Sequence, residues 1–502
     1  MPNFLFIFLF FISFSCFSQA YEGYTLYSPL QSNTTYLINM NGQVVHQWDC
    51  ASSPASTAHL LENGSIMRPR RISSPTMTGG AVGGILEIID WSGNVTWSYI
   101  VSDQDYQQHH ECIPMKMSNG DYHALIITWN RRSNVEAIQA GRQGINGEMW
   151  PTSILEIEPV GANGGNIVWK WEAWDHLCQD VDSLKDNYKN NCDNHPELID
   201  INVGNVQTGG FGGGGGDWIH ANGIDWDPIR DQIVFSSHTL DEIFVIDHST
   251  TTLEAASNTG GNSGRGGDIL YRWGMPANYG AAGSQELYVV HGANFIDEGS
   301  PGAGNLMCFN NGNMPGNSND NSEVLEIDPP YDGNYNYTLP WNQNAIWTYS
   351  DPGNFYSNHL SGAFRLPNGN TLVSEGTSLH IFEVTENGNI VFDYTHPGGG
   401  NFAKATRYGH GYSGLVNIYE KYDNTAISVF PNPFRDKTNI IFSQNSHLYS
   451  VQVYDYTGKV CFAENDLYGG EFLFQRNSLI PGVYFIQIEY DNKKIVEKLI
   501  IY

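Results

Sequence analysis

A hairpin motif recurs six times along this chain of 502 residues. Each copy has a first strand resembling "ILEID", then a turn containing Gly or Asn, then a second strand that ends in Trp or Tyr. Alternating apolar and polar residues around such a turn are typical of a β-hairpin. Recurrence at intervals of about 45 to 90 residues predicts a repeat fold. The copies lie at 35–48, 85–99, 154–171, 243–274, 324–349 and 381–394.

A second recurrent piece lies between the hairpins, a strand pair split by a turn such as "ENG", "SNG" or "PNGN". One pair and one hairpin make four strands, the content of a propeller blade. The last piece, at 408–419, has no hairpin after it, so we expect it to complete the blade that the N-terminus opens and to leave no free sheet edge. We therefore predict an all-β chain with a six-bladed β-propeller over 21–422.

The composition argues against one class of partner. The formal net charge is −29, and only 15% of residues are charged. Such a chain cannot neutralise phosphates, so we expect no nucleic acid partner. Abundant Gly and aromatic residues agree with an all-β fold that has many turns.

The first 20 residues are an apolar run that ends in the small-residue pattern "SQA", which predicts a secretory signal peptide. A membrane anchor is the alternative. Export permits disulfides, and an even six cysteines remain beyond this segment. Cys178 and Cys192 bracket a polar loop and are the expected pair, with Cys50 and Cys112 as a weaker second pair.

A histidine follows every copy of the hairpin. The inner strands of a propeller line its central channel, so equivalent positions in different blades converge there. A single histidine before a strand is more often a turn or core residue, but six in one register predict a ring of imidazoles. The members are His59, the pair His109 and His110, His220, His291, His359 and His410.

Clustered imidazoles suit three kinds of chemistry. Neutral imidazole is the commonest metal ligand, and Glu111, which follows His109 and His110 in the sequence, could supply a carboxylate ligand to such a metal site. One histidine can instead act as a nucleophile while others act as acid or base. Imidazolium groups can also bind anions at acidic pH. The residues alone leave these three open, and no cofactor motif is present, because the glycine run at 209–216 lacks the Gly-Lys-Ser/Thr ending of a phosphate loop.

The repeat pattern of the sequence ends near residue 423, and short segments of alternating apolar and polar residues over 423–502 predict a small β-sandwich. This segment carries "PNP" at 431–433, the pattern D-x-x-G-K at 455–459, "PGVY" at 481–484 and a closing strand with Lys498. Together they resemble the type A C-terminal sorting domain of the type IX secretion system. The resemblance implies a partner in that machinery and a secreted or cell-surface location in a Gram-negative bacterium, reached through the periplasm.

The propeller region has specific motifs of its own, namely "HHECIPMKMSNGD", "DWIHANGIDWDPIRDQIVFSS", "LYVVHGANF" and "FYSNHLSGAFRLPNGNTL". With their surroundings, over about 21–420, they resemble the arylsulfate sulfotransferase (ASST-like) family. The resemblance implies an enzyme that moves a sulfuryl group from an aryl sulfate to a phenolic acceptor through a sulfohistidine. Such an enzyme uses no nucleotide donor and no cofactor.

The resemblance also implies roles for individual residues. His359 falls in the blade that bears the family nucleophile, so it is expected to attack sulfur. His220 and His291 match two further active-site histidines and are expected to donate hydrogen bonds to the sulfuryl and leaving oxygens. The residues expected to hold the substrates are His109, His110, Trp129, Trp218 and Phe295. For each of the three aromatic residues, packing within a blade is the alternative role.

The chain departs from the family pattern at two places. An active-site Arg is expected after the second histidine, but 308–324 contains none, and His238 stands where the third motif would end in Arg. Arg131, Arg365 and Arg407 are the candidates to balance the transferring oxygens. The alternative function is a non-catalytic secreted propeller that binds an aryl, glycan or protein ligand. A metal-dependent hydrolase or lyase is the third candidate function.

Overall fold

The structure is a computed structural model that describes residues 19–206, 215–312, 321–415, 427–442, 447–455, 458–490 and 493–502. The chain divides into two compact units, Met1–Gly414 and Leu415–Tyr502. Most of the predicted signal peptide lies outside the described residues. No helix in the described part is long and apolar enough to cross a membrane.

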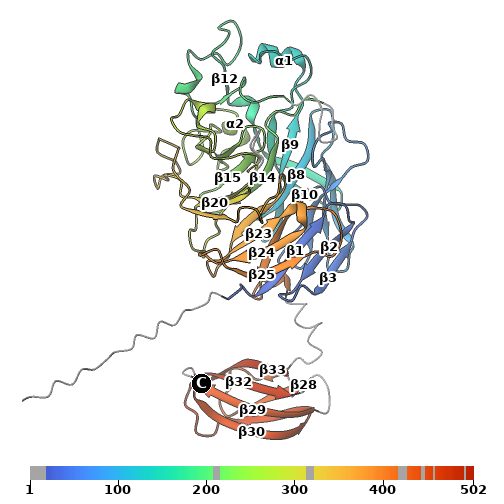
Figure 1. Ribbon diagram of the computed structural model, residues 1–502. Helices are drawn as coiled ribbons and strands as arrows, with labels where there is room; N and C mark the ends of the chain where they lie inside the picture. The colour runs from blue at the N-terminus through green and yellow to red at the C-terminus, as the bar shows by residue number, and fades with distance from the viewer. Residues whose placement is uncertain are drawn as a thin grey trace, which may run out of the picture. The chain divides into compact units, whose positions relative to one another are not determined.

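The first unit confirms the predicted six-bladed propeller (Figure 1). Each blade is a four-stranded antiparallel sheet, and the first strands of blades three, four, five, six and one contact one another in turn. From inner to outer strand, blade one contains β26 (Phe402–Gly409), β1 (Gly23–Pro29), β2 (Thr34–Ile38) and β3 (Val44–Asp49), and blade two contains β4 (His59–Leu60), β5 (Ile66–Arg71), β6 (Gly84–Ile89) and β7 (Val95–Ile100). Blade three contains β8 (Tyr106–Lys116), β9 (Tyr122–Asn130), β10 (Thr152–Val160) and β11 (Gly164–Glu172), and blade four contains β14 (Ala221–Asp227), β15 (Gln232–Ser237), β16 (Glu242–Asp247) and β17 (Tyr271–Trp273). Blade five contains β18 (Val290–Phe295), β19 (Leu306–Asn310), β20 (Glu323–Ile327) and β21 (Trp347–Ser350), and blade six contains β22 (Gly362–Arg365), β23 (Thr371–Glu375), β24 (His380–Val384) and β25 (Ile390–Thr395).

Blade one is built from both ends of the propeller chain. Strand β1 pairs with β26 from Gly23 opposite Gly409 to Pro29 opposite Phe402. The expected closure is therefore present, but the strand that provides it precedes His410 instead of following it. Because all six inner strands run the same way along the channel, His410 lies at the opposite end of its strand from the other motif histidines.

The aromatic residue that ends each hairpin joins its blade to the next one. The indole N–H of Trp48 in blade one donates to the carbonyl of Asp90 in blade two at 3.0 Å. In blade six the hydroxyl of Tyr394 bonds to that of Tyr27 in blade one at 2.9 Å. An indole that packs between sheets with its N–H satisfied suits such a joint. The remaining donors and acceptors are Trp97 to Gly164, Trp171 to Gly267, Trp273 to Gln343, and Trp347 to Glu386.

Short helical and extended segments gather at one end of the propeller, where β12, α1 and α2 lie (Figure 1). Four of the nine segments outside the blades in the described chain belong to an insertion between β11 and β14. The segments outside the blades are α1 (Asn134–Gln139), η1 (Ala173–Asp175), β12 (Leu177–Cys178), η2 (Cys192–Asn194), β13 (Ile199–Asp200), α2 (Thr252–Ala255), η3 (Pro276–Tyr279), η4 (Gly376–Ser378) and η5 (Ser413–Leu415).

Two buried cysteines of this insertion lie side by side. The thiols of Cys178 and Cys192 are within hydrogen-bonding reach of each other, and both are reduced. Burial raises the pKa of both thiols, that of Cys192 to about 11. The weaker expected pair is wrong, because Cys50 follows the outermost strand of blade one and Cys112 lies on the inner strand of blade three.

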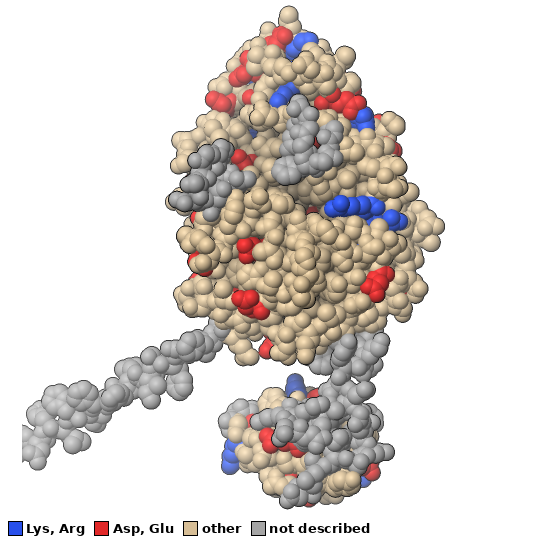
Figure 2. Space-filling view, turned by 45° about the vertical axis from the view of Figure 1, so that its right-hand side comes forward, with Lys and Arg blue, Asp and Glu red and all other residues tan. Residues whose placement is uncertain are grey.

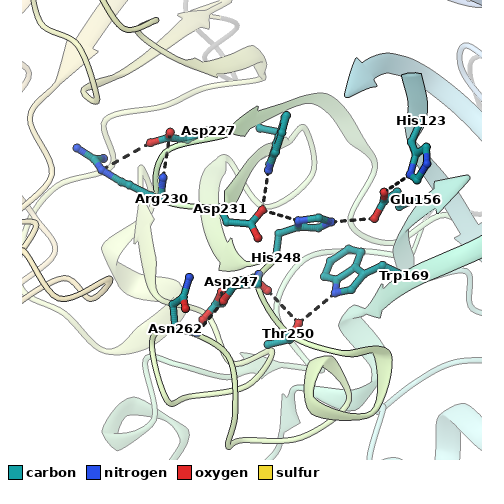
Figure 3. A network of polar contacts seen from close by, with 12 residues as sticks. His123, Glu156, Trp169, Asp227, Arg230, Asp231, Asp247, His248, Thr250 and Asn262 are labelled. Carbon is teal, nitrogen blue, oxygen red and sulfur yellow. Dashed lines mark hydrogen bonds and ion pairs between the residues drawn. The ribbon is translucent and has the colours of Figure 1, made fainter. Parts of the chain in front are cut away.

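Blades three and four are also joined by a row of ionisable side chains (Figure 3). Nδ1 of His248 lies 2.7 Å from Asp231 Oδ1, and its Nε2 lies 3.2 Å from Oε2 of Glu156 on β10. The other carboxylate oxygen of Glu156 contacts His123 on β9. Burial alone would lower the pKa of His248, but its hydrogen bonds to both carboxylates and their charges raise it to about 9. A charged His248 therefore bridges the two blades at neutral pH.

Charged side chains are sparse on the face of the molecule seen in Figure 2, where Lys and Arg form a few small groups among largely uncharged residues. This agrees with the low fraction of charged residues, 15%.

The second unit contains two antiparallel sheets that share one apolar core. Phe434, Ile440, Val451 and Ile486 are buried in that core. The result is the small sandwich expected for this part of the chain. One sheet contains β27 (Ile427–Phe430), β28 (Lys437–Phe442) and β31 (Glu471–Gln475), and the other contains β30 (Val460–Gly469), β29 (His447–Asp455), β32 (Gly482–Tyr490) and β33 (Lys493–Ile501).

Candidate functional site

The inner strands of blades three to five each carry a β-bulge next to a histidine. His110 and His220 have left-handed backbones, with φ of 52° and 49°, and Gly292 beside His291 has φ of 61°. In blade six Ser361 has φ of 86°. Such strain costs about 1–3 kcal/mol at a non-glycine residue and is concentrated at functional sites. Bulges re-aim side chains, and here they bring histidines of different blades together.

Five imidazoles form a continuous row across blades three, four and five. Ring centroids lie 4.9 Å apart for His110 and His220, 5.0 Å for His220 and His238, and 5.7 Å for His238 and His291. His109 joins the row through its Nδ1, which lies 2.7 Å from Nδ1 of His110. We call these five residues the histidine row.

One end of the histidine row is held by tryptophans. The ring of His109 stacks on Trp129 at 4.1 Å, and Trp129 packs against Trp150 at 5.7 Å. A pocket of about 570 Å³ lies beside Trp150, and its lining includes Glu148 and Gly216.

Asp217 fixes the orientation of His220. The Nδ1–H of His220 donates to Oδ2 of Asp217 at 2.5 Å, and both side chains are buried. Burial would raise the pKa of Asp217, but the charge of His220 and this hydrogen bond hold the pKa below its ordinary value. The carboxylate is thus ionised, and Nε2 is the ring nitrogen of His220 that is not bonded to Asp217.

The two ring nitrogens of His291 are both engaged. Nδ1 donates to Oδ1 of Asn311 at 2.6 Å, and Nε2 accepts the backbone N–H of Leu360 at 3.2 Å. The amide of Asn311 in turn donates to the carbonyls of Ser357 and Leu360. His291 and Asn311 therefore hold the segment that carries His359 in place by hydrogen bonds to its backbone.

His359 lies at the blade-six side of the histidine row and is half-buried. Its Nδ1 donates to Oδ1 of Asn358 at 2.5 Å, and its carbonyl accepts the hydroxyl of Ser357 at 2.9 Å. It interacts electrostatically with His238 and His291. Burial lowers the pKa of His359, so the imidazole is neutral at pH 7 with its lone pair on Nε2.

Burial also removes charge from the histidine row itself. It lowers the pKa of His109 and of His291 to about 3. Burial, followed by repulsion from neighbouring imidazoles, holds the pKa values of His110 and His238 well below 6.5. These four imidazoles are therefore neutral at pH 7, and a neutral imidazole can attack an electrophile or accept a proton.

Two members of the predicted ring lie elsewhere. His59 is partly buried at the start of β4, where desolvation and the charge of Lys404 lower its pKa to about 3. His410 packs on Tyr24 and faces Glu22 at 3.6 Å, beyond the far end of β26. The bulged strands of blades three to six bring the remaining motif histidines together, so the site covers part of the channel circumference.

The structure also locates the aromatic residues expected to hold substrates. Trp218 is fully buried in an apolar core, and its indole N–H donates to the carbonyl of Val203 at 2.8 Å. Phe295 ends β18 and packs in another core, remote from His291 near the start of that strand. Of the aromatic candidates, Trp129 is the one with a ring contact to the histidine row.

Each of the three candidate arginines is paired with a carboxylate. Arg131 pairs with Glu148 at 2.6 Å, Arg365 with Glu326 at 2.5 Å, and Arg407 with Glu383 at 3.4 Å. The last two lie toward the far ends of their inner strands. That one of the three replaces the missing Arg stays a prediction, and of the three Arg131 lies nearest the blade-three end of the row, through Glu148 and Trp150.

Glu111 is paired with a lysine through one of its two carboxylate oxygens. Its Oε2 lies 2.8 Å from Nζ of Lys404 and accepts the N–H of Ile224. Lys404 is in blade one and Glu111 in blade three, and inner strands of non-neighbouring blades meet only across the channel, so this buried pair crosses it. Within the described residues no group of three His, Cys, Asp or Glu is arranged to hold a metal.

Sequence reasoning missed three residues of the site. His238 ends the second strand of blade four and so has no counterpart in the repeat of inner-strand histidines. Asp217 precedes His220 by three residues, and the "DWIH" spacing was its available signal. Asn311 carries no signal of its own, because its role depends on blade six packing against blade five.

Comparison with known proteins gives two family matches. The model described as "Arylsulfotransferase (ASST)" matches residues 22–401, and the model described as "Secretion system C-terminal sorting domain" matches residues 428–502. A search of curated proteins found no match.

Several solved structures are similar to this chain at low sequence identity. A protein of unknown function from Bacteroides caccae is 10% identical, with 77% of this chain and 98% of that chain covered and a TM-score of 0.42. The periplasmic gluconolactonase of Pseudomonas aeruginosa is 11% identical, with 90% and 98% covered and a TM-score of 0.32. Virginiamycin B lyase from Staphylococcus aureus is also 11% identical, with 88% and 94% covered and a TM-score of 0.30. At such identities and scores the likenesses carry no conclusion about chemistry.

Proposed function

This chain belongs to the arylsulfotransferase (ASST) family, and on that premise we propose that it transfers a sulfuryl group from an aryl sulfate to a phenolic acceptor through a sulfohistidine at His359. The observation that carries this proposal is the state of His359. Its Nδ1–H is committed to Asn358, its pKa is lowered by burial, and its lone pair is therefore on Nε2 at neutral pH. A neutral, oriented imidazole nitrogen is the form that attacks sulfur.

In the first step Nε2 of His359 forms a bond to sulfur while the bond from sulfur to the aryl oxygen breaks and the phenolate leaves. In the second step the oxygen of the acceptor phenol attacks the same sulfur and the bond to His359 breaks. The acceptor must lose its phenolic proton in this step. Nε2 of His220 is the base that we assign, because Asp217 holds its Nδ1–H and stabilises the imidazolium that forms.

The other predicted residues take supporting roles in this proposal. His291 holds the segment of His359 in place. His109, backed by Trp129, and His110 line the blade-three side, where the aryl groups of donor and acceptor bind. The pocket of about 570 Å³ beside Trp150 has a volume in the range of small-molecule sites. We assign no substrate contact to Trp218 or Phe295.

The C-terminal sorting domain indicates export by the type IX secretion system of a Gram-negative bacterium. We propose that the propeller acts outside the cell, either released or on the cell surface. Its substrates would then be phenolic compounds and aryl sulfates of the surroundings.

The test is a transfer assay with a chromogenic aryl sulfate and a phenol. Wild-type protein should release at most one equivalent of donor phenol per site without the acceptor and turn over continuously with it, and His359→Ala should lose both. His410→Ala is the matched control, since that histidine lies at the far end of its strand, and it should keep full activity. Binding of an aryl sulfonate by wild-type protein without any transfer would favour the second candidate, a non-catalytic aryl-binding propeller, which the lack of an Arg in 308–324 supports.

A further inference from the structure

A buried lysine and glutamate meet across the channel next to the histidine row. Glu111 follows His110 directly on β8, and its Oε2 lies 2.8 Å from Nζ of Lys404 on β26. The side chain of Glu111 is 2% exposed and that of Lys404 is 4% exposed. The inner strands run from the histidine row into the channel, so a residue that follows a row histidine lies deeper in the channel. The pair therefore lies just beyond the row.

Several blades contribute to the surroundings of this pair. Oε2 of Glu111 also accepts the backbone N–H of Ile224 in blade four at 3.1 Å. Nζ of Lys404 lies 5.2 Å from the centroid of the Phe364 ring in blade six. Gly362 of the same strand makes room for the lysine stem, since a Cβ there would lie 3.1 Å from Cδ of Lys404. Contacts from blades one, three, four and six thus meet at one level of the channel.

The polar atoms around the pair are closed off from solvent. Oε1 of Glu111 and Nε2 of His59 expose almost no surface and have no hydrogen-bond partner within the described residues. Desolvation, followed by the charge of Lys404, lowers the pKa of His59 to about 3. A polar atom in contact with bulk water would be hydrated, so these observations indicate that bulk water does not reach this level of the channel.

Water at this level would compete with the proposed reaction, in which His359 carries a sulfuryl group between two half-reactions. In the competing step a water oxygen forms a bond to sulfur while the bond from sulfur to Nε2 of His359 breaks. The products are sulfate, free His359 and the two protons of the water, which pass to solvent. The sulfuryl group is then lost to hydrolysis instead of reaching the phenol. Closed active sites suppress such side reactions by excluding water.

We propose that the ion pair of Lys404 and Glu111 closes the channel beyond the histidine row and keeps water from reaching the sulfuryl group on His359 from that end. Lys404 thus influences how the sulfuryl group is divided between phenol and water. This division rests on the proposed function, whereas the closure of the channel does not.

Two double variants separate the shape of the pair from its charge. Lys404→Met/Glu111→Gln replaces the ion pair by neutral side chains of similar length and should keep the channel closed. Lys404→Ala/Glu111→Gln leaves a gap with polar walls that water can enter. Neither double variant leaves a buried charge without its partner, which would itself destabilise the fold. Lys116→Ala, at the exposed end of β8, is the control.

The first measurement is the partition of the sulfuryl group. The full chain turns over an aryl sulfate at a fixed concentration of phenol, and ion chromatography gives the ratio of sulfate to sulfated phenol. For Lys404→Ala/Glu111→Gln we expect this ratio to rise at least about threefold, because water gains a second route to the site. Wild-type protein, Lys404→Met/Glu111→Gln and Lys116→Ala should share one low ratio. A loss of folded protein alone would lower both products together and leave the ratio unchanged.

The second measurement needs no catalysis. Hydrogen–deuterium exchange of the peptide that spans 221–227 reports on the amide of Ile224, whose acceptor is the side chain at position 111. This amide should exchange at least about tenfold faster in Lys404→Ala/Glu111→Gln than in Lys404→Met/Glu111→Gln, because water reaches it from the channel.

Equal exchange in the two double variants would overturn the closure, and an unchanged ratio of sulfate to sulfated phenol would overturn its role in excluding water. Failure of the proposed function has a different signature. In that case no variant transfers a sulfuryl group, while exchange at Ile224 still differs between the two double variants.

Discussion

The backbone N–H of Leu360 donates to Nε2 of His291 at 3.2 Å, and this hydrogen bond joins blade five to the segment that carries the proposed nucleophile. Since Nε2 of His291 is an acceptor here, it does not donate to the sulfuryl oxygens in this arrangement. We therefore regard His291 as a positioning residue for His359.

Replacing His291 should disturb orientation more than binding. For His291→Phe we expect kcat to fall about a hundredfold with KM changed little, because a misplaced nucleophile loses the near-attack geometry. Asn311→Leu, which releases the same segment, should act in the same direction. Steady-state kinetics with an aryl sulfate would measure both, and a large rise in KM at unchanged kcat would argue for direct substrate binding by His291.

Asp217→Asn should slow the second half-reaction. The amide no longer favours the Nδ1–H form of His220 or stabilises its imidazolium, so we expect the rate of transfer to the acceptor to fall about 10²- to 10³-fold. Single-turnover measurements separate this step from formation of the intermediate. An equal loss in both steps would contradict the assignment of His220 as the base for the acceptor.

The interblade contact of His248 predicts how stability depends on pH. The pKa of His248 is raised to about 9, so its stabilising contribution is complete below the unfolded value near 6.5 and is lost as pH rises through about 9. The pKa values of Glu156 and Asp231 are lowered despite burial, by hydrogen bonds and the charge of His248, so their contribution is lost as pH falls below about 4.

His248→Gln tests this account. The variant should lose roughly 1–3 kcal/mol of unfolding free energy at pH 7 and much less at pH 10. Thermal or denaturant unfolding of the full chain across this range would measure the difference. A destabilisation that stays constant from pH 7 to pH 10 would contradict a charged bridge.

The adjacent thiols of Cys178 and Cys192 predict a disulfide in the exported protein. In this reaction the two thiols reduce one disulfide of a thiol oxidase, and the products are the Cys178–Cys192 disulfide and the reduced oxidase. Closing this loop of about 15 residues should add about 3 kcal/mol of stability. Because burial raises both pKa values, the folded thiols are poor nucleophiles, and the bond should form before the insertion packs.

Peptide mapping of protein purified from the periplasm or medium, without reductant, would detect the bond. Cys178→Ser should remove the linked peptide and lower the melting temperature, whereas Cys308→Ser, at a buried cysteine of another blade, should leave the link intact. Quantitative labelling of both thiols in wild-type exported protein would contradict the prediction.

The sequence was sufficient for the architecture because each blade repeats the same local pattern. Alternation, Gly/Asn turns and the terminal aromatic residue are all local signals, and the aromatic residue proved to be the joint between blades. The phase of the repeat also located His220, His291 and His359. It failed for His410, because the inner strand of blade one comes from residues before that histidine.

The details of the site depend on features that a strand pattern does not contain. The bulges at His110 and His220 alter which way side chains point, and His238 enters the row from the end of a second strand. Arg365 and Arg407 were plausible from their strands, but their carboxylate partners come from neighbouring strands and blades. Such pairings are set by tertiary packing.

The central claim is that His359 carries the sulfuryl group. The direct measurement is to mix the protein with an excess of aryl sulfate without acceptor, quench rapidly under alkaline conditions that preserve phosphoramidate-like bonds, and map the peptides by mass spectrometry. We predict an added SO₃ group on the peptide that contains His359, discharged when a phenol is added before the quench and absent in His359→Ala. An added SO₃ group on another residue, or acceptor-dependent transfer that persists in His359→Ala, would contradict the account.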